Sequence, residues 1–367
     1  MESGDNRNVK TLRLVQNPED PTRSARDLAE AARILKSGGL VALPTETVYG
    51  LGANALDAVA VGHIFQAKRR PSWDPLIVHI ADPAMLDGLV TEISPAAQKL
   101  IDAFWPGPLT LLLPRTPVIP DAVTAGRPLM GVRMPAHPVA LELIRLAGVP
   151  VAAPSANLFS HTSPTTAAHV LADLDGRIDA VLDAGAAEHG VESTVLDPTS
   201  SPMRIYRPGA ITAEQIAAVA GDVDTFQPQG PLVDAEAEEA SQLERTRTAL
   251  PSPGVGLRHY APKARLILVD ATEDRLPALM AELAREYSTE QIGLLEPAGL
   301  VLSLAVATRF PWGRWTAPRE MARALYAGLR SLDEAGCTVI LAPLPPADGI
   351  GAAIRDRMRK AAFRTVE

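Results

Sequence analysis

Residues 27–44, DLAEAARILKSGGLVALP, carry the pattern on which the fold prediction rests. Four apolar residues between Leu28 and Leu35 recur at the spacing that places them on one face of an α-helix. Two glycines follow, and glycine readily adopts the left-handed conformation that ends a helix. The apolar segment 40–44 then predicts a short buried strand. A helix followed directly by a buried strand indicates an α/β protein.

The same alternation continues toward the middle of the chain. Helix patterns lie at 55–68, after the Ser94–Pro95 N-cap and at 137–148. Strand patterns lie at 75–80 and 108–114, and residues 149–157 read as a strand followed by a loop. The segment TETVYGLG is expected to be a loop, and residues 179–207 to alternate short strands with turns. Strands and helices therefore interleave to about residue 220, which predicts a first α/β domain over residues 1–225.

A second α/β unit follows a segment that has no periodic face. Residues 226–262 are rich in proline, glycine and acidic residues, which predicts an interdomain linker. Beyond it, strand patterns at 264–270, 291–297 and 338–343 alternate with helix patterns at 272–287, 318–336 and 350–362. This alternation favours a small, parallel, three-layer domain over residues 263–367.

The composition is that of a folded chain with more than one domain. Its 367 residues exceed an ordinary single domain, and its 47 % apolar and 21 % charged residues exclude a disordered protein. The net charge of −8 disfavours stable binding of bulk nucleic acid, because such binding needs a basic excess to neutralise phosphates. The single cysteine, Cys337, excludes an internal disulfide and a multi-cysteine metal site and suits a reducing compartment.

No targeting or membrane segment is evident in the sequence. The N-terminal residues MESGDNRNVK lack the apolar run of a signal peptide, and no stretch of about 18 apolar residues could span a bilayer. We therefore expect a cytoplasmic protein without a membrane partner.

Familiar catalytic motifs are also missing. No GxxxxGK(S/T) phosphate loop, GxSxG elbow or HExxH metal pair occurs. GLGANA at 50–55 satisfies the GxGxxA pattern of dinucleotide-binding folds, with the acidic residue Asp74 downstream. Because this segment continues several residues beyond the predicted strand, a turn permitted by glycine is the competing interpretation.

Loops rich in cations and hydroxyl groups carry most of the functional information. They place Lys68 and Arg70 in KRRP, Arg133 in GVRMP, Ser155 and Asn157 in PSAN, Ser193 in GVESTVLD and Arg207 in IYRPG. Such side chains at element ends suit phosphate and carboxylate ligands. None looks like a nucleophile with a paired base, which predicts catalysis by positioning and charge stabilisation.

Each of these residues also has a purely structural interpretation. A lone arginine near a turn is commonly a solvated surface charge, and a serine at a strand end is commonly a cap. Thr45 and Thr47 could hydrogen-bond only within their own loop, and His79 lies between apolar neighbours, as a satisfied core histidine would. Individually, these residues do not decide the function.

Taken in order, the segments resemble one family. LPTETVYGLGANA, KRRPSWDPLIVHI, FWPGPLTLLL, GVRMPAHP, APSANLFSHTSPT, GVESTVLD and RIYRPGAI are similar to the threonylcarbamoyl-AMP synthase family and its YrdC-like domain. PSPGVGLRHYAPKA and GIGAAIRDRMRKAA resemble the two-domain subtype, and the resemblance runs from about residue 24 to 363. It implies a twisted open mixed sheet with helices, followed by a smaller three-layer Rossmann-like α/β domain.

The resemblance implies a nucleotidyltransferase that joins L-threonine, bicarbonate and ATP into L-threonylcarbamoyladenylate and releases pyrophosphate. Mg²⁺ would accompany the ATP, with no metal site of the protein's own. Downstream tRNA-modifying transferase proteins would then move the threonylcarbamoyl group to an adenosine beside the tRNA anticodon. The pocket would hold several mutually repelling anions, so cations must line it.

The resemblance also assigns residues to that site. Lys68 and Arg70 would be catalytic, and Lys68, Arg70, Arg133 and Arg207 would supply the cations. Thr47, His79, Arg133 and Ser193 would bind L-threonine. Arg70, Asp74, Ser155, Ser163, Arg207 and Tyr260 would bind ATP, with Thr45 and Asn157 supporting them. The linker would close over the site as a lid that carries Tyr260.

Two positions depart from the family pattern. Arg69 stands where the family usually has glycine, and Asp74 stands where it usually has asparagine. An aspartate beside phosphates repels them unless a cation neutralises it, so Asp74 is expected beside either Mg²⁺ or Arg70.

Three other functions compete with this interpretation. Carbamoyl-adenylate chemistry uses the same domain type in longer, cysteine-rich chains, whereas this chain has one cysteine. An RNA-binding module of the same fold is opposed by the net charge of −8. A dinucleotide-dependent oxidoreductase would depend on GLGANA alone.

Overall fold

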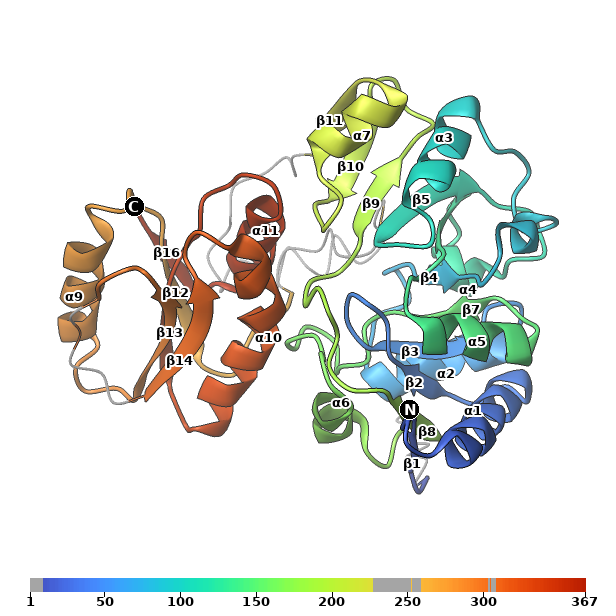
Figure 1. Cartoon of the computed structure of the whole chain (residues 1–367), viewed down its shortest axis with the longest axis horizontal. Helices are drawn as coiled ribbons and strands as arrows, with labels where there is room; N and C mark the ends of the chain where they lie inside the picture. The colour runs from blue at the N-terminus through green and yellow to red at the C-terminus, as the bar shows by residue number, and fades with distance from the viewer. Residues whose placement is uncertain (1–8, 227–251, 253–258, 303, 305–307) are drawn as a thin grey trace, which may run out of the picture.

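The computed structural model describes residues 9–226, 252, 259–302, 304 and 308–367, which form two α/β domains (Figure 1). In the described residues, the first domain contains an eleven-stranded sheet and the second a five-stranded sheet. The fold class predicted from the sequence is confirmed. Most of the predicted linker, residues 227–251 and 253–258, lies outside the described residues.

The large sheet mixes parallel and antiparallel neighbours. Its strands lie in the order β1 (Leu12–Val15), β8 (Ala180–Asp183), β2 (Val41–Leu43), β3 (Gly50–Asn54), β7 (Val151–Ala152), β4 (Ile77–His79), β6 (Leu129–Arg133), β5 (Leu109–Pro114), β9 (Thr194–Asp197), β10 (Met203–Arg207) and β11 (Val223–Thr225). For example, β4 pairs with β6 in parallel, and β5 pairs with β6 antiparallel. The mixed sheet expected from the family resemblance is therefore present.

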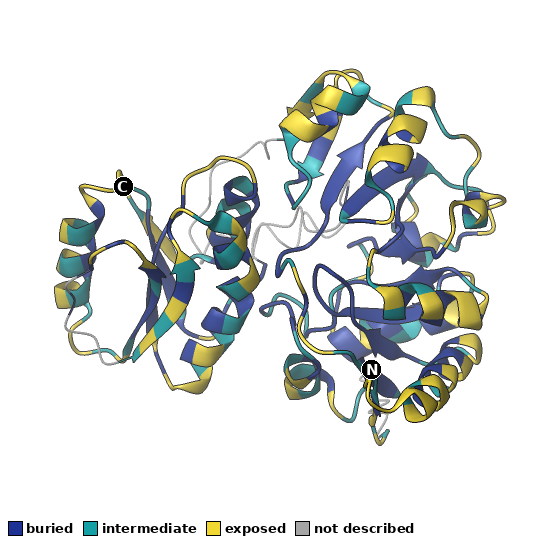
Figure 2. Ribbon diagram, viewed as in Figure 1, coloured by how far each residue is buried: buried dark blue, intermediate teal, exposed yellow. Residues whose placement is uncertain are grey.

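Helices pack around this sheet and begin and end where local chemistry dictates. They are α1 (Pro21–Lys36), α2 (Ala58–Lys68), α3 (Pro95–Phe104), α4 (Asp121–Thr124), α5 (Pro138–Ala147), α6 (Ala167–Leu174) and α7 (Ala213–Ala220), with a 3₁₀ turn at Pro83–Leu86. The Ser94 hydroxyl accepts a hydrogen bond from Ala97 N, and Gly148 ends α5 with φ 68°. Both ends follow the sequence prediction. The outer helices present exposed faces, while the central strands are buried and the edge strands β1 and β11 are partly exposed (Figure 2).

The GLGANA segment is a strand, so the loop and the dinucleotide-turn interpretations of it are both wrong from Gly50 onward. It forms β3, in which Gly52 pairs antiparallel with Val41 of β2 and Ala53 with Ala152 of β7. A Cβ on Gly52 would lie 2.8 Å from the side chains of Leu43 and Val151. Glycine is therefore needed for close strand packing rather than for a phosphate-binding turn.

The second domain has the predicted parallel, three-layer arrangement. Its strands lie in the order β14 (Thr308–Arg314), β13 (Ile292–Ala298), β15 (Val339–Pro343), β12 (Arg265–Val269) and β16 (Arg364–Val366), and all neighbours are parallel. Helix α9 (Leu276–Glu286) covers one face, and α10 (Pro318–Glu334) and α11 (Gly351–Ala361) cover the other (Figure 1). Strands β14 and β16 were not predicted. No helix in the described part of the chain is long and apolar enough to cross a membrane.

The two domains share a tightly packed contact. Val48 and Val191 of the first domain belong to the hydrophobic core of the second. Gly190 has φ +72°, and a Cβ there would lie 2.5 Å from both Ala322 O and Arg323 Cα of α10. Helix α10 therefore packs directly against the loop that leads into β9, and α10 and α11 face the first domain (Figure 1).

Candidate active site

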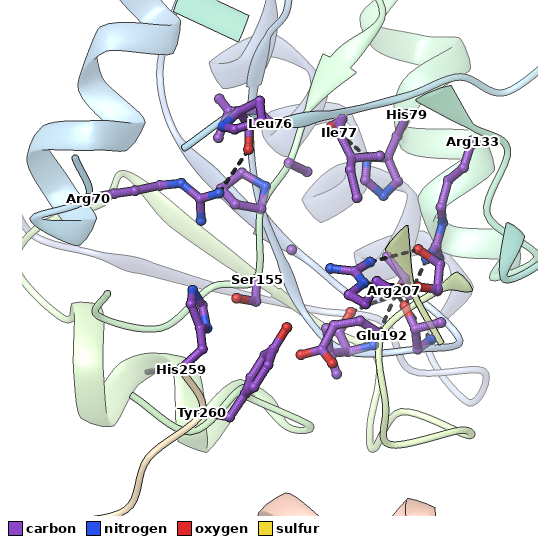
Figure 3. Close-up of a pocket in the computed structure, with 18 residues that line it drawn as sticks. Arg70, Leu76, Ile77, His79, Arg133, Ser155, Glu192, Arg207, His259 and Tyr260 are labelled. Carbon is purple, nitrogen blue, oxygen red and sulfur yellow. Dashed lines mark hydrogen bonds between the residues drawn. The ribbon is translucent and has the colours of Figure 1, made fainter. Parts of the chain in front are cut away.

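A pocket lies at the ends of the central strands of the large sheet (Figure 3). His79 ends β4 and Arg133 ends β6, and the parallel register pairs these two residues directly. Ser193 immediately precedes β9, and Arg207 ends β10. The strand order therefore brings together side chains that are far apart in the sequence.

Most of the predicted site residues line this pocket. They are Thr45, Thr47, Arg70, His79, Arg133, Ser155, Ser193, Arg207 and Tyr260. The remaining four predicted residues, Lys68, Asp74, Asn157 and Ser163, are buried but are not part of the pocket wall that the described residues form. The structure thus places three of the four predicted cations around one hollow.

Arg133 is held by the loop that follows β2. Its Nη2 lies 2.9 Å from Glu46 Oε2, and its Nη1 donates to Thr47 Oγ1 at 3.0 Å. The Thr47 and Thr45 hydroxyl oxygens are 2.8 Å apart, which fixes this loop further. Arg133 Nε is buried and finds no hydrogen-bond partner among the described residues. A buried donor without a partner is costly, so this nitrogen is suited to a ligand.

His79 is a neutral imidazole at this position. Its Nδ1 lies 3.3 Å from Ile77 O, and the ring is buried. Burial, reinforced by the positive charge of Arg133, lowers the pKa of His79 to about 3. A neutral ring next to a guanidinium can accept a hydrogen bond from a ligand without adding charge to the pocket.

Arg207 and Ser193 are joined across the pocket floor. Arg207 Nε donates to Ser193 O at 3.1 Å, and its Nη2 donates to Ser193 Oγ at 3.1 Å. Gly209 permits this contact, since a Cβ there would lie 2.2 Å from Thr194 N. The turn after β10 therefore packs against the start of β9 without any room for a side chain.

Arg70 follows the end of α2 and carries its own counter-ion. Arg69 ends that helix in the left-handed conformation with φ 53°, which turns the chain toward the pocket. Arg70 Nη2 lies 2.9 Å from Asp74 Oδ2 and donates to Pro75 O at 2.8 Å. Asp74 stands behind Arg70 and off the pocket wall, so the carboxylate that departs from the family pattern is neutralised inside the protein.

The expectation that Lys68 lines the pocket is not met. Its side chain is buried beneath the PSAN loop, where Nζ donates to Ser155 O and Asn157 O at 2.5 Å each. Burial, together with the positive charge of Arg70, lowers the pKa of Lys68 well below its usual range. Asn157 donates to Leu158 O at 2.7 Å in the same loop. Lys68 and Asn157 thus hold the loop that presents Ser155.

Three residues at the site, two glutamates and one histidine, were not predicted to be site residues from the sequence. Glu192 and His259 line the pocket, and Glu46 pairs with Arg133. Each adjoins a predicted residue within a family-like motif, and that adjacency was the available signal. Burial and the positive charge of Arg70 lower the pKa of His259 to about 3, and neither ring nitrogen has a hydrogen-bond partner among the described residues.

Two family models together match most of the chain. Residues 33–209 match the Sua5/YciO/YrdC model, described as "Telomere recombination", and residues 211–363 match "Threonylcarbamoyl-AMP synthase, C-terminal domain". Curated proteins from Pyrococcus abyssi and Bacillus subtilis, both named threonylcarbamoyl-AMP synthase, are 41 % and 42 % identical to it. The matches cover 90 % of this chain and 92 % of the first relative, and 96 % and 98 % for the second. The chain belongs to the threonylcarbamoyl-AMP synthase family.

Solved structures of the threonylcarbamoyl-AMP synthase family share the architecture of both domains. P. abyssi Sua5 complexed with L-threonine has a TM-score of 0.85 and 39 % identity, covering 97 % of this chain and 99 % of that chain. A variant of the same protein gives a TM-score of 0.86 at 38 % identity, covering 97 % and 98 %. These relatives do not favour an RNA-binding module or carbamoyl-adenylate chemistry.

Two of the three arginines that line the pocket have a carboxylate counter-ion in the protein. Arg70 faces Asp74 and Arg133 faces Glu46, while Arg207 donates to uncharged groups of Ser193. These preformed contacts hold each guanidinium in place before any ligand arrives, which reduces the reorganisation that binding requires.

Proposed function

We propose that this chain synthesises L-threonylcarbamoyladenylate from L-threonine, bicarbonate and ATP and releases pyrophosphate. The observation that carries the proposal is the convergence of Arg70, Arg133 and Arg207 on one pocket. Family membership and relatives named for this activity support it. We also propose that the product supplies tRNA-modifying transferase proteins in the cytoplasm.

The reaction needs no nucleophile from the protein. The uncharged amine of threonine attacks the carbon of CO₂ and loses a proton, or attacks the carbon of bicarbonate with loss of water, and either route gives a carbamate. A carbamate oxygen then attacks the α-phosphorus of ATP, and the bond from that phosphorus to the bridging oxygen of pyrophosphate breaks. Every reactant is an anion or carries a carboxylate, so the repulsion between them is the barrier that the protein must lower.

The arrangement of the pocket supports a division of labour. Arg133 and Thr47 would bind the threonine carboxylate, with the buried Arg133 Nε as a further donor. Neutral His79 would accept a hydrogen bond from the amine. The P. abyssi relative, which was solved in complex with L-threonine, supports an amino-acid site in this fold. Arg70, Ser155, Arg207 and Tyr260 would contact the nucleotide from the other walls.

Mg²⁺ would reach the site as part of the ATP substrate. Among the described residues, no three histidine, cysteine, aspartate or glutamate side chains gather to hold a metal ion. The acidic side chains nearest the pocket also already have partners, as Asp74 has in Arg70. Because Arg70 and Arg133 are already paired with carboxylates, much of the triphosphate charge would be offset by the bound cation.

The proposal is tested by measuring pyrophosphate release and the mass of the adenylate product. Full-length protein is incubated with MgATP and with threonine and bicarbonate together, each alone, or neither, and serine or valine replaces threonine in matched reactions. We expect release that requires both threonine and bicarbonate. Release that is independent of either substrate, or a product lacking the threonine mass, would overturn the proposal.

A further inference from the structure

Glu192 is a carboxylate in the wall of a pocket that is proposed to bind anions, and its partners come largely from the other domain. Arg357 of α11, 165 residues away, donates from Nε to Glu192 Oε2 at 2.7 Å. We propose that Arg357 and Tyr326 are positioning residues of the active site, and that they make nucleotide binding by the first domain depend on the second by holding and compensating Glu192. This inference rests on the proposed function.

The two oxygens of Glu192 are fully engaged by three side chains. Oε1 accepts a hydrogen bond from Ser163 Oγ at 2.6 Å. The Tyr326 hydroxyl lies 3.2 Å from Oε1 and 3.0 Å from Oε2, and Arg357 completes the set at Oε2. Two of the three donors therefore belong to α10 and α11 of the second domain (Figure 1).

Compensation is needed because Glu192 stays ionised. Burial alone would raise the pKa of Glu192, but the positive charges of Arg357 and Arg207, with the hydrogen bond from Ser163, outweigh it and lower the pKa to about 2. Without Arg357, a buried negative charge would face the bound triphosphate. Removing one partner of a buried ion pair leaves an uncompensated charge, which is far more costly than losing an exposed pair.

Arg357 also touches the segments that carry two other pocket residues. Its Nη2 donates to Pro208 O at 2.9 Å, immediately after Arg207. Its guanidinium lies 5.3 Å from the ring centre of Tyr260, and that ring stacks on Tyr326 at 5.9 Å. Arg207, Glu192 and Tyr260 line the same pocket (Figure 3). One buried arginine of α11 therefore fixes three parts of the wall at once.

Another interdomain ion pair provides a matched control. Arg330 of α10 lies 2.8 Å from Asp173 of the first domain, and both side chains are largely buried. These residues line a different cleft, beside Ser160 and Lys263. Arg330 also donates to Thr162 O. Arg330→Met therefore removes a comparable tie between the domains without removing any of the three side chains that hydrogen-bond to Glu192.

The test compares full-length Arg357→Met, Glu192→Gln, the double variant and Arg330→Met. MgATP affinity is measured by calorimetry, and KM for ATP and kcat by pyrophosphate release. We expect Arg357→Met to weaken MgATP binding by about tenfold or more, the loss typical of a charge-assisted contact. Glu192→Gln in the same chain should restore most of that loss, because the uncompensated charge is then absent. Arg330→Met should bind MgATP like the wild type.

The outcomes separate charge compensation from simple packing. Equal impairment of Arg357→Met and the double variant would overturn the proposal, as would wild-type binding in a folded Arg357→Met protein. If Arg357→Met does not fold, the double variant is expected to fold and bind MgATP, and failure of both would overturn it. A wild-type protein that binds MgATP but makes no adenylate would reject the proposed function and leave the binding comparison intact.

Discussion

Arg133 Nη2 and Glu46 Oε2 lie 2.9 Å apart, buried beside the pocket, so the cation that we propose for the threonine carboxylate already holds a carboxylate from the protein. Glu46 orients the guanidinium, and Nε stays available as a buried donor. A ligand carboxylate can thus be bound without breaking the internal pair. The sequence placed Arg133 in the site, but only the fold shows that the adjacent Glu46 sets its orientation.

Arg133→Ala should raise KM for threonine by about 10- to 150-fold, because a hydrogen bond to a charged group contributes roughly 1.5–3 kcal/mol. The variant is assayed by pyrophosphate release at saturating ATP and bicarbonate. Arg145→Ala on α5 is the control, since Arg145 is exposed and forms only long contacts of 3.5 Å, with Glu142 Oε2 and with Ala81 O. An unchanged KM for threonine in Arg133→Ala would place the amino acid elsewhere.

Arg69→Gly should stabilise the protein by about 0.5–1 kcal/mol, because Arg69 ends α2 with φ 53° and a left-handed arginine costs roughly 1–2 kcal/mol. Part of that gain is offset by the larger entropy that glycine gives the unfolded chain. Urea unfolding measures the change. Arg69→Ala, which removes the charge but keeps the Cβ, should not stabilise the protein. An equal gain in stability in Arg69→Ala would show that the effect comes from removing the charge and not from the backbone conformation.

Gly209→Ala should destabilise the protein by about 1–3 kcal/mol and lower kcat/KM, because the new methyl group would press on the backbone of the segment that carries Ser193. The nearest atoms, Thr194 N at 2.2 Å and Ser193 C at 2.5 Å, cannot move as a flexible side chain could. Gly62→Ala in α2 is the control, with nothing within 4 Å of its Cβ position. That substitution should be neutral or stabilising.

Acid should destabilise the fold through its buried neutral histidines. Burial lowers the pKa of His79 and of His259 to about 3 in the folded protein, so below about pH 6.5 the unfolded chain binds protons that the folded chain excludes. The free energy of unfolding should therefore fall as the pH drops from 6.5 toward 3, by about 1.4 kcal/mol per pH unit for each histidine.

Urea unfolding of His79→Asn between pH 7 and pH 4 checks this linkage. The free energy of unfolding of His79→Asn should fall less steeply with decreasing pH than that of the wild type, because one histidine no longer contributes. His259→Asn should show a similar decrease in slope. Identical pH profiles for the wild type and both variants would show that these rings are protonated in the folded state.

The sequence predicted elements whose ends are set locally. Ser94 caps α3 and Gly148 ends α5, and both signals lie within the helix they define. Strand β3 was missed because the glycine at position 52 is explained only by packing. A Cβ there would collide with the side chains of Leu43 and Val151, and Val151 is distant in the sequence. Strand β14 includes Pro311 and Gly313, which do not follow a strand pattern.

The site was predictable at the level of residue type and less so at the level of geometry. Hydroxyl groups and arginines at strand ends converge as the α/β pattern suggests, because neighbouring strands place their ends together. The direction in which the Lys68 side chain points is set by the loop at Ser155 and Asn157, whose carbonyl oxygens accept hydrogen bonds from Lys68 Nζ. The Glu192–Arg357 pair joins residues 165 positions apart in different domains, and no local pattern encodes such a pairing.

The packing at Gly190 restricts how this chain can be recombined. Any larger residue there would collide with backbone atoms of α10 at 2.5 Å. A chimera that joins this first domain to a second domain from a distant relative would have to reproduce the same close helix approach. In this chain, the two halves are consequently expected to be exchangeable only as one block.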